Sequence, residues 1–186
     1  MKTKILLFSL FILAGSVAFA QTTPEPADVI LAKAYKQAAK EKKNVFVIFH
    51  ASWCVWCKKI DASMEDPSCK DYFNRSYVIV HLTVMENGEK KKDINPGAED
   101  MLKKYFGSNS GIPVFLIFDK KGTLLGDSQI RKPGEGLDKP GQNMGCPAAP
   151  EEVAAFVDLL KKTSKMADAE ATAVTERFKK NNPATH

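Results

Sequence analysis

The chain has 186 residues, of which 44% are hydrophobic and 26% charged, with four cysteines and a formal net charge of +5. These proportions are those of an ordinary soluble protein, and they exclude a collagen-like chain, a wholly disordered chain and a membrane protein with many spans. Four cysteines are too few for a disulfide-stapled mini-protein. The charge is modest and spread along the chain, so it indicates no nucleic acid partner.

The first twenty residues predict a secretory signal peptide. Lys2 and Lys4 give a basic start, residues 5–13 are almost purely apolar, and residues 18–20 form a small-x-small cleavage site. Cleavage near Ala20 places the mature protein in the periplasm or outside the cell. An uncleaved membrane anchor is the alternative, because the apolar character continues weakly past residue 13. No later stretch is long and apolar enough to span a bilayer, so we expect no membrane span after cleavage.

The next segments alternate between helix and strand patterns. Residues 21–27 hold two prolines and predict a flexible leader. Residues 28–43 carry one modest apolar face among lysines, which predicts a helix. Residues 45–49 are continuously apolar and rich in β-branched side chains, which predicts a strand buried on both faces. Residues 54–64 predict a second helix, and a short helix through Tyr72 follows a proline break.

The middle of the chain predicts the rest of a sheet. Residues 77–84 read as a second strand, and residues 86–93 as a charged loop. Residues 96–106 predict a helix, and residues 114–118 a third strand. A glycine-containing turn then leads into a fourth strand from Thr123, so this pair predicts a hairpin.

The last part contains a long irregular segment and one clear helix. Residues 131–150 are rich in glycine and proline and show no periodicity, and they are too long for an incidental connection. A helix opens at Pro150 with its apolar positions on one face. Residues 164–186 are alanine-rich and charged, and they predict a helical or disordered tail with little to bury. The predicted domain therefore spans residues 28–163.

This order of elements predicts an α/β fold. A strand-helix-strand start implies parallel pairing with a right-handed crossover, and the closing hairpin adds antiparallel strands. We expect a central mixed sheet of four to five strands flanked by helices on both faces.

The chemistry is concentrated where the first strand meets its helix. Cys54 and Cys57 lie three residues apart on the first helical turn, so they can close a small disulfide ring. The helix N-terminus favours a thiolate at Cys54, and a thiolate is the species that attacks a disulfide. Cys57 is placed to resolve a mixed disulfide on Cys54. This start of a helix is expected to be exposed.

With its Trp53-Cys54-Val55-Trp56-Cys57 segment after an apolar strand, and Ile112-Pro113 before the third strand, the chain resembles the thioredoxin superfamily. It is similar to the exported thioredoxin-like proteins of bacterial envelopes. The resemblance covers residues 45–162 and implies a thioredoxin-like fold, with Cys54 as the attacking and Cys57 as the resolving cysteine.

The resemblance also implies positioning roles. Trp53 matches an aromatic residue beside the active site, and Pro113 matches a cis-proline that faces the cysteine pair. A cis bond there leaves the Ile112 backbone to pair with an extended substrate.

The chain departs from the family at the position six residues before Cys54. Many thioredoxins have a buried aspartate there that helps the resolving thiol lose its proton, whereas this chain has Ile48. Glu86 and His81 are weak candidates for that task, with a packed or surface histidine as the plainer interpretation of His81. His50 is a candidate for tuning Cys54.

The remaining cysteines, Cys69 and Cys146, admit a structural disulfide between them, or two unpaired small apolar residues. Cys146 as a third redox cysteine is a weaker possibility. The spacing alone does not decide among these interpretations, because bridging requires close Cα atoms.

The function expected is that of a thiol-disulfide oxidoreductase that reduces or reshuffles disulfides of exported proteins, as a monomer. Its electrons come from a protein partner, and no metal or other cofactor is implied. Two alternatives stay open. One is a metal-binding module that uses Cys54 and Cys57 as soft ligands. The other is a non-catalytic binding protein of thioredoxin fold in which the two cysteines form an inert disulfide.

Overall fold

The computed structural model describes residues 23–185. The predicted signal peptide and its cleavage site lie outside these residues. Among residues 23–185, no helix has both the length and the apolar character needed to cross a bilayer. The regular elements, in chain order, are α1 (Ala27–Glu41), β1 (Asn44–His50), α2 (Val55–Met64), α3 (Lys70–Ser76), β2 (Tyr77–Thr83), η1 (Gly88–Asp93), α4 (Ala98–Phe106), β3 (Val114–Phe118), β4 (Leu124–Asp127), β5 (Gln129–Ile130), β6 (Gln142–Asn143), α5 (Pro150–Thr163), α6 (Asp168–Lys179) and η2 (Pro183–Thr185).

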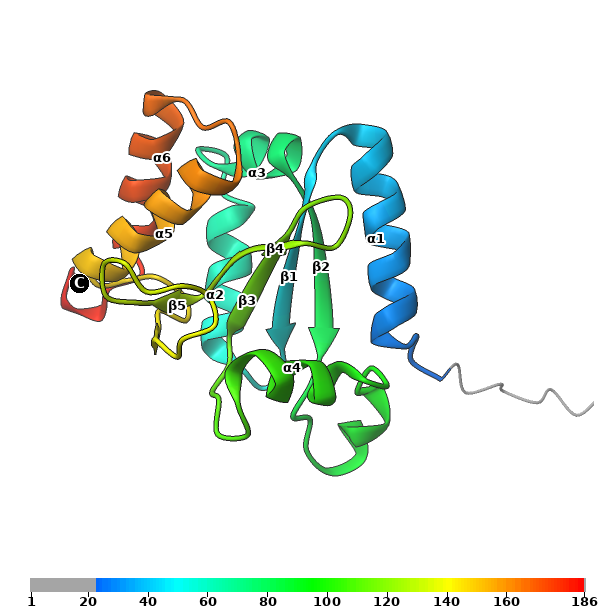
Figure 1. Cartoon of the computed structure of the whole chain (residues 1–186). Helices are drawn as coiled ribbons and strands as arrows, with labels where there is room; N and C mark the ends of the chain where they lie inside the picture. Colours follow the sequence, from blue (N-terminus) through cyan, green and yellow to red (C-terminus); the bar gives the residue numbers. More distant parts are fainter. Residues whose placement is uncertain (1–22, 186) are drawn as a thin grey trace, which may run out of the picture.

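A four-stranded mixed sheet in the order β2-β1-β3-β4 forms the centre (Figure 1). The first two strands pair in parallel, with Ile48 opposite His81, and the other neighbours are antiparallel. The central strands are buried on both faces, as their unbroken apolar sequence predicts. The predicted mixed sheet and its helix-covered faces are confirmed.

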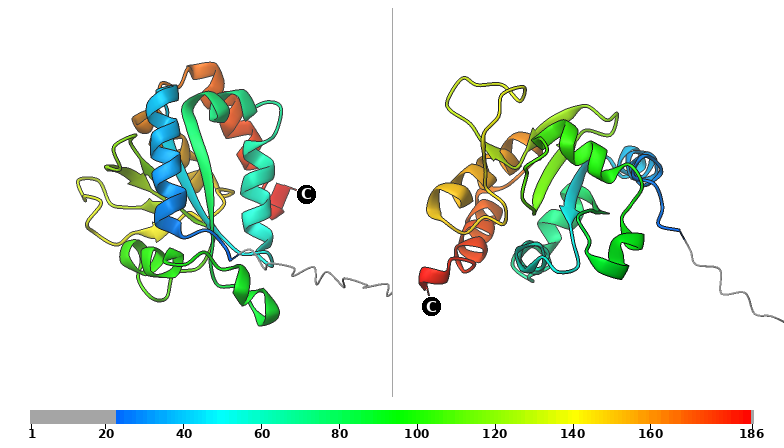
Figure 2. Two further views of the ribbon diagram at one scale, coloured as in Figure 1. Left: turned by 90° about the vertical axis from the view of Figure 1, so that its right-hand side faces the viewer. Right: turned by 90° about the horizontal axis from the view of Figure 1, so that it is seen from below.

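Side-chain alternation along β1 divides the interior into two cores. Val45, Val47 and Phe49 face α1 and α4, whereas Phe46 and Ile48 face the side covered by α2, α3, α5 and α6. Figure 2 gives two further views of this layered arrangement. The carboxyl end of β1, where the chain turns into α2, is therefore held between two packed layers.

The segment after residue 163 is part of the domain core. The prediction that it has little to bury is wrong, because α6 inserts Ala171, Val174 and Phe178 into the core that α2 and α5 share. The Phe178 ring lies 4.9 Å from the ring of Phe156, centroid to centroid. The core thus extends beyond the expected domain end.

The long glycine- and proline-rich segment has a defined structure. A short hairpin joins β5 to β6, and the Arg131 guanidinium binds both carboxylate oxygens of Asp127 at 2.7 and 2.6 Å. Arg131 also donates to the Lys139 carbonyl oxygen, which closes the loop on itself. The charged loop predicted for residues 86–93 contains the 3-10 helix η1.

Candidate active site

The cysteine pair lies where β1 ends and α2 begins. Cys54 has extended backbone angles and caps α2, because the N–H of Cys57 donates to its Sγ at 3.1 Å. The two sulfur atoms form a disulfide, with Cα atoms 5.3 Å apart. A cysteine at a helix N-terminus sits among unpaired backbone N–H groups, which stabilise a thiolate once the disulfide is reduced.

The exposure of the motif is uneven. Trp53 is 50% exposed and Val55 63%, as expected for the start of a surface helix, but Cys54 is only 4% exposed and Cys57 1%. The expectation of an exposed motif is therefore wrong for the two cysteines. They pack against Ala51 and Ile112, so the segment before β3 covers them.

That covering segment contains the predicted cis bond, between Ile112 and Pro113. The carbonyl oxygen of Ile112 lies 3.8 Å from Cys54 Sγ. Asn143, in β6, donates its side-chain N–H to the Pro113 carbonyl oxygen at 3.2 Å. The sequence offered no signal for Asn143, because this contact joins the long loop to a strand start 30 residues away.

A second support comes from the residues that follow β2. The indole Nε1 of Trp53 donates to the Met85 carbonyl oxygen at 2.8 Å. The buried Glu86 carboxylate accepts from the backbone N–H of Ser52 at 2.5 Å and from its hydroxyl at 2.9 Å. Lys90 donates to the same hydroxyl at 2.9 Å. The loop that leads into Cys54 is thereby fixed by hydrogen bonds.

These contacts show what Glu86 does in the oxidised protein. Sequence patterns suggest Glu86 as a proton acceptor, whereas in the structure its carboxylate accepts hydrogen bonds from Ser52.

Met85 adopts a left-handed backbone conformation, with φ 54°, which is unusual for a residue other than glycine. Its N–H donates to Glu99 at 3.1 Å, so the unusual turn has its own support. Ser52 and Met85 were not singled out from the sequence.

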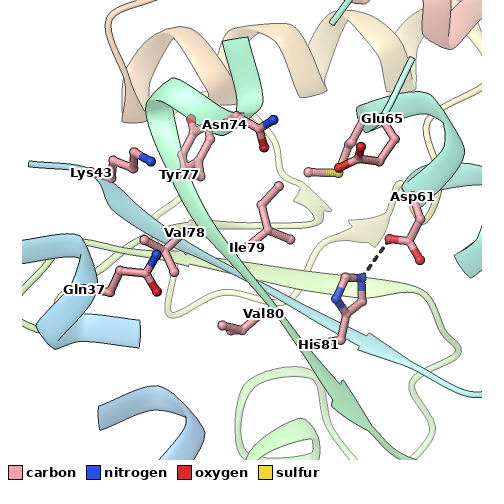
Figure 3. A pocket seen from close by; sticks show the side chains of 11 residues that line it. Gln37, Lys43, Asp61, Glu65, Asn74, Tyr77, Val78, Ile79, Val80 and His81 are labelled. Carbon is pink, nitrogen blue, oxygen red and sulfur yellow. Dashed lines mark hydrogen bonds and ion pairs between the residues drawn. The ribbon is translucent and has the colours of Figure 1, made fainter. Parts of the chain in front are cut away.

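A group of histidines lies on the α2 side of the sheet. His81 Nε2 lies 2.8 Å from the Asp61 carboxylate (Figure 3). The His81 ring is 5.0 Å from the ring of His50. Ile48, at the position where many thioredoxins carry aspartate, is completely buried. Burial, helped by the nearby His81, lowers the pKa of His50 below its ordinary value. At neutral pH His50 is therefore uncharged.

A small cavity of about 230 Å³ lies beside the cis bond. Trp56, the cis pair of residues 112–113 and the loop residues 143–146 line it. Lys59 Nζ lies 4.3 Å from the centre of the Trp56 ring, so a cation stands over one side of this wall. The cavity thus joins the Trp56 side chain of the Cys-x-x-Cys motif to the cis-proline and the long loop.

Cys69 and Cys146 are buried and unpaired, so a disulfide between them is not formed. The Sγ of Cys69 lies 3.7 Å from the Ala173 carbonyl oxygen, and Asn181 donates to the Sγ of Cys146 at 3.4 Å. Burial raises the pKa of Cys146 to about 12, which makes it a poor redox nucleophile.

Within residues 23–185 no group of three or more histidine, cysteine or acidic side chains is arranged to hold a metal ion. Cys54 and Cys57 are bonded to each other. No observation in the described part of the chain therefore favours the metal-binding alternative.

The model of a family described as Thioredoxin-like matches residues 28–120, half of the chain. The chain belongs to this thioredoxin-like family. The match includes β1, the cysteine pair, α2 and the cis-proline, and the fold is that of thioredoxin-like disulfide oxidoreductases with a disulfide-forming Cys-x-x-Cys pair. No curated protein matches the chain significantly.

Solved structures of thioredoxin-like proteins are similar to this chain. A disulphide isomerase from Xylella fastidiosa Temecula1 is 15% identical, with 83% of this chain and 90% of that chain covered and a TM-score of 0.44. A thioredoxin from Thermus thermophilus is 16% identical, with 74% and 83% covered and a TM-score of 0.43. The C-terminal domain of DsbD from Neisseria meningitidis is 22% identical, with 54% and 81% covered and a TM-score of 0.37.

Proposed function

We propose that the protein is a thiol-disulfide oxidoreductase of the cell envelope that reduces or reshuffles disulfides in exported proteins. The observation that carries this proposal is the Cys54–Cys57 disulfide at the start of α2, packed against a cis Ile112–Pro113 bond. The predicted signal peptide supports the location. The donor or acceptor of electrons is a partner protein.

The reduced form attacks through Cys54. Its thiolate bonds to one sulfur of a substrate disulfide, the substrate S–S bond breaks, and the other substrate sulfur leaves as a thiolate. Cys57 then loses its proton and bonds to Cys54 Sγ, which releases the second substrate thiolate. The product is the Cys54–Cys57 disulfide seen in the structure. Two electrons pass from the cysteine pair to the substrate.

Trp53, Ile112 and Pro113 position the substrate in this proposal. An extended segment that pairs with the Ile112 backbone would hold its disulfide over Cys54, because that carbonyl oxygen lies 3.8 Å from the sulfur. The adjoining 230 Å³ cavity accepts a side chain beside the substrate cysteine. Backbone pairing gives affinity for many sequences, which suits an enzyme with several exported substrates.

The direction of electron flow follows from the residues between the cysteines. Val55 and Trp56 place no cationic or polar group there, so the thiolate at Cys54 depends mainly on the helix terminus. A less stabilised thiolate makes the disulfide harder to reduce and the dithiol a better reductant. We therefore propose a reductase, and the reduction potential of the pair, measured against glutathione, tests this directly.

The function is tested by reduction of insulin disulfides with dithiothreitol as the electron source. We expect Cys54→Ser to abolish turnover and Cys57→Ser to accumulate mixed disulfides with the substrate. Cys69→Ala removes a buried cysteine away from the pair and serves as the matched control, with activity retained. Inactivity of the wild-type protein with every donor, or wild-type turnover in both serine variants, would refute the proposal and favour an inert disulfide.

A further inference from the structure

The resolving cysteine is enclosed where a base is needed. Cys57 is 1% exposed, and the residue beneath this end of the helix, Ile48, has no polar atom in its side chain. A thiol must lose its proton before it attacks a disulfide. Bulk water has poor access to this sulfur, so the acceptor has to come from nearby side chains.

The fold brings three polar side chains to the layer between α2 and the sheet face that α2 covers. Side chains alternate along β1, so His50 lies on the same face as Ile48, the face that α2 covers. Ile48 pairs with His81 across the parallel strands, which sets His81 on that face too. Asp61 follows Cys57 by one helical turn, so their side chains project from adjacent positions on α2.

Contacts connect these side chains to one another and to solvent. His81 Nε2 lies 2.8 Å from Asp61 Oδ1, and the two imidazole rings are 5.0 Å apart at 62°. Asp61 and His81 line a groove of about 640 Å³ along the outer edge of β2, where each side chain is more than a third exposed (Figure 3). His50 is half-buried, and its ring contacts that of His81, which lines the open groove.

The electrostatic surroundings keep His50 neutral at neutral pH. His50 Nε2 lies 3.3 Å from the Thr83 hydroxyl. Its charged and titratable neighbours are His81, Asp61 and Glu86: burial and His81 lower the pKa of His50, and the two carboxylates offset part of that effect. A neutral imidazole at neutral pH is free to take a proton. Glu86 already accepts two hydrogen bonds from Ser52.

We propose that His50 accepts the proton of Cys57 in the resolving step, and that the His81–Asp61 pair positions His50 and carries the proton onward. The Cys57 S–H bond breaks, the proton moves to the imidazole directly or through one water molecule, and the thiolate bonds to Cys54 Sγ. The bond between Cys54 and the substrate breaks, and the substrate leaves as a thiolate. The imidazolium then passes its proton through His81 and Asp61 to solvent in the groove.

This inference rests on the proposed function, and one experiment separates the two. Reduced protein is mixed with Ellman's reagent, whose disulfide releases one coloured thiolate when Cys54 attacks and a second when Cys57 resolves. The first phase depends on reagent concentration and the second does not. The Cys57→Ser variant reports the first phase alone.

In His50→Gln we expect the second phase to slow at pH 7 by at least about 10-fold, because a positioned base commonly contributes more than that. Its pH profile moves upward, towards the range near 8.5 where an unassisted thiol ionises. The first phase stays unchanged. His81→Gln and Asp61→Asn slow the second phase by a smaller factor. If His50→Gln does not fold, these two variants still test the relay. Asn74, on α3, lines the same groove. The variant Asn74→Ala is therefore the matched control, and it leaves both phases unchanged.

The outcomes are distinct. If Cys57→Ser shows no first phase, the proposed function fails. If both phases are present but the second keeps its rate and pH midpoint in all three relay variants, the relay is refuted while the function stands. Equal slowing of both phases in His50→Gln would indicate a purely structural role and would also refute the relay.

Discussion

The ion pair of Arg131 and Asp127 yields the sharpest stability prediction. The Arg131 side chain is 8% exposed and that of Asp127 3%, and two hydrogen bonds of 2.7 and 2.6 Å join them. The Asp127 carboxylate holds the pKa of Arg131 above its usual range. In Arg131→Ala the carboxylate remains buried without its cation.

The cost follows from burial rather than from bond length. Removing one partner of a buried pair destabilises a protein by about 3–5 kcal/mol, because the other charge is left desolvated. Arg75 and Glu170 supply a comparison, since they pair at 2.7 Å but the Arg75 side chain is 58% exposed. An exposed pair contributes about 0–1 kcal/mol. We therefore expect Arg131→Ala to cost several times more than Arg75→Ala.

Urea denaturation followed by circular dichroism measures both variants against the parent protein. A loss of about 3–5 kcal/mol corresponds to a midpoint shift of roughly 1.5–2.5 M for an m-value near 2 kcal/mol/M. Replacing both Arg131 and Asp127 by leucine should recover part of the loss, because no buried charge then remains. Equal losses in Arg131→Ala and Arg75→Ala would show that burial of the pair does not govern its contribution.

Three further predictions concern the core, the free thiols and pH. Phe178→Ala should cost about 3–5 kcal/mol in urea denaturation, and a loss below 1 kcal/mol would mean that α6 is not part of the core. In the oxidised folded protein Cys69 and Cys146 should react slowly with Ellman's reagent and rapidly after unfolding in guanidinium; a fast thiol in the folded state would contradict their burial. Because the pKa of His50 is lowered on folding, the unfolded state binds more protons, so stability should fall as pH drops below about 6.5. This part of the pH dependence should vanish in His50→Gln, and an unchanged slope would refute it.

Local patterns in the sequence predicted those parts of the fold that depend on neighbouring residues. The strand at residues 114–118 agrees with β3 residue for residue, because an unbroken apolar run is typical of a central strand with two buried faces. The cysteine pair and the cis bond at Pro113 were likewise predictable, since both belong to short motifs.

Contacts between distant segments were not predictable in the same way. Ser52 and Glu86 are 34 residues apart in the sequence. The residues around each of them give no sign that the Glu86 carboxylate holds the Ser52 loop in place. The core role of α6 was missed because Ala171, Val174 and Phe178 make a sparse apolar face, which only the aromatic rings of other helices complete. A disulfide between Cys69 and Cys146 was considered only because two cysteines remain beside the active-site pair. Whether they can bond depends on the distance between them, which the fold determines.

The long loop after β5 also bears on the substrate pairing proposed above. Proline has no N–H, and the carbonyl oxygen of Pro113 already accepts from Asn143. In the proposed function, main-chain pairing at the cis bond uses the Ile112 backbone, whose carbonyl oxygen lies 3.8 Å from Cys54 Sγ. Arg131 anchors the loop that leads to Asn143, so in the proposed function the buried ion pair would support the substrate-binding backbone as well as the fold.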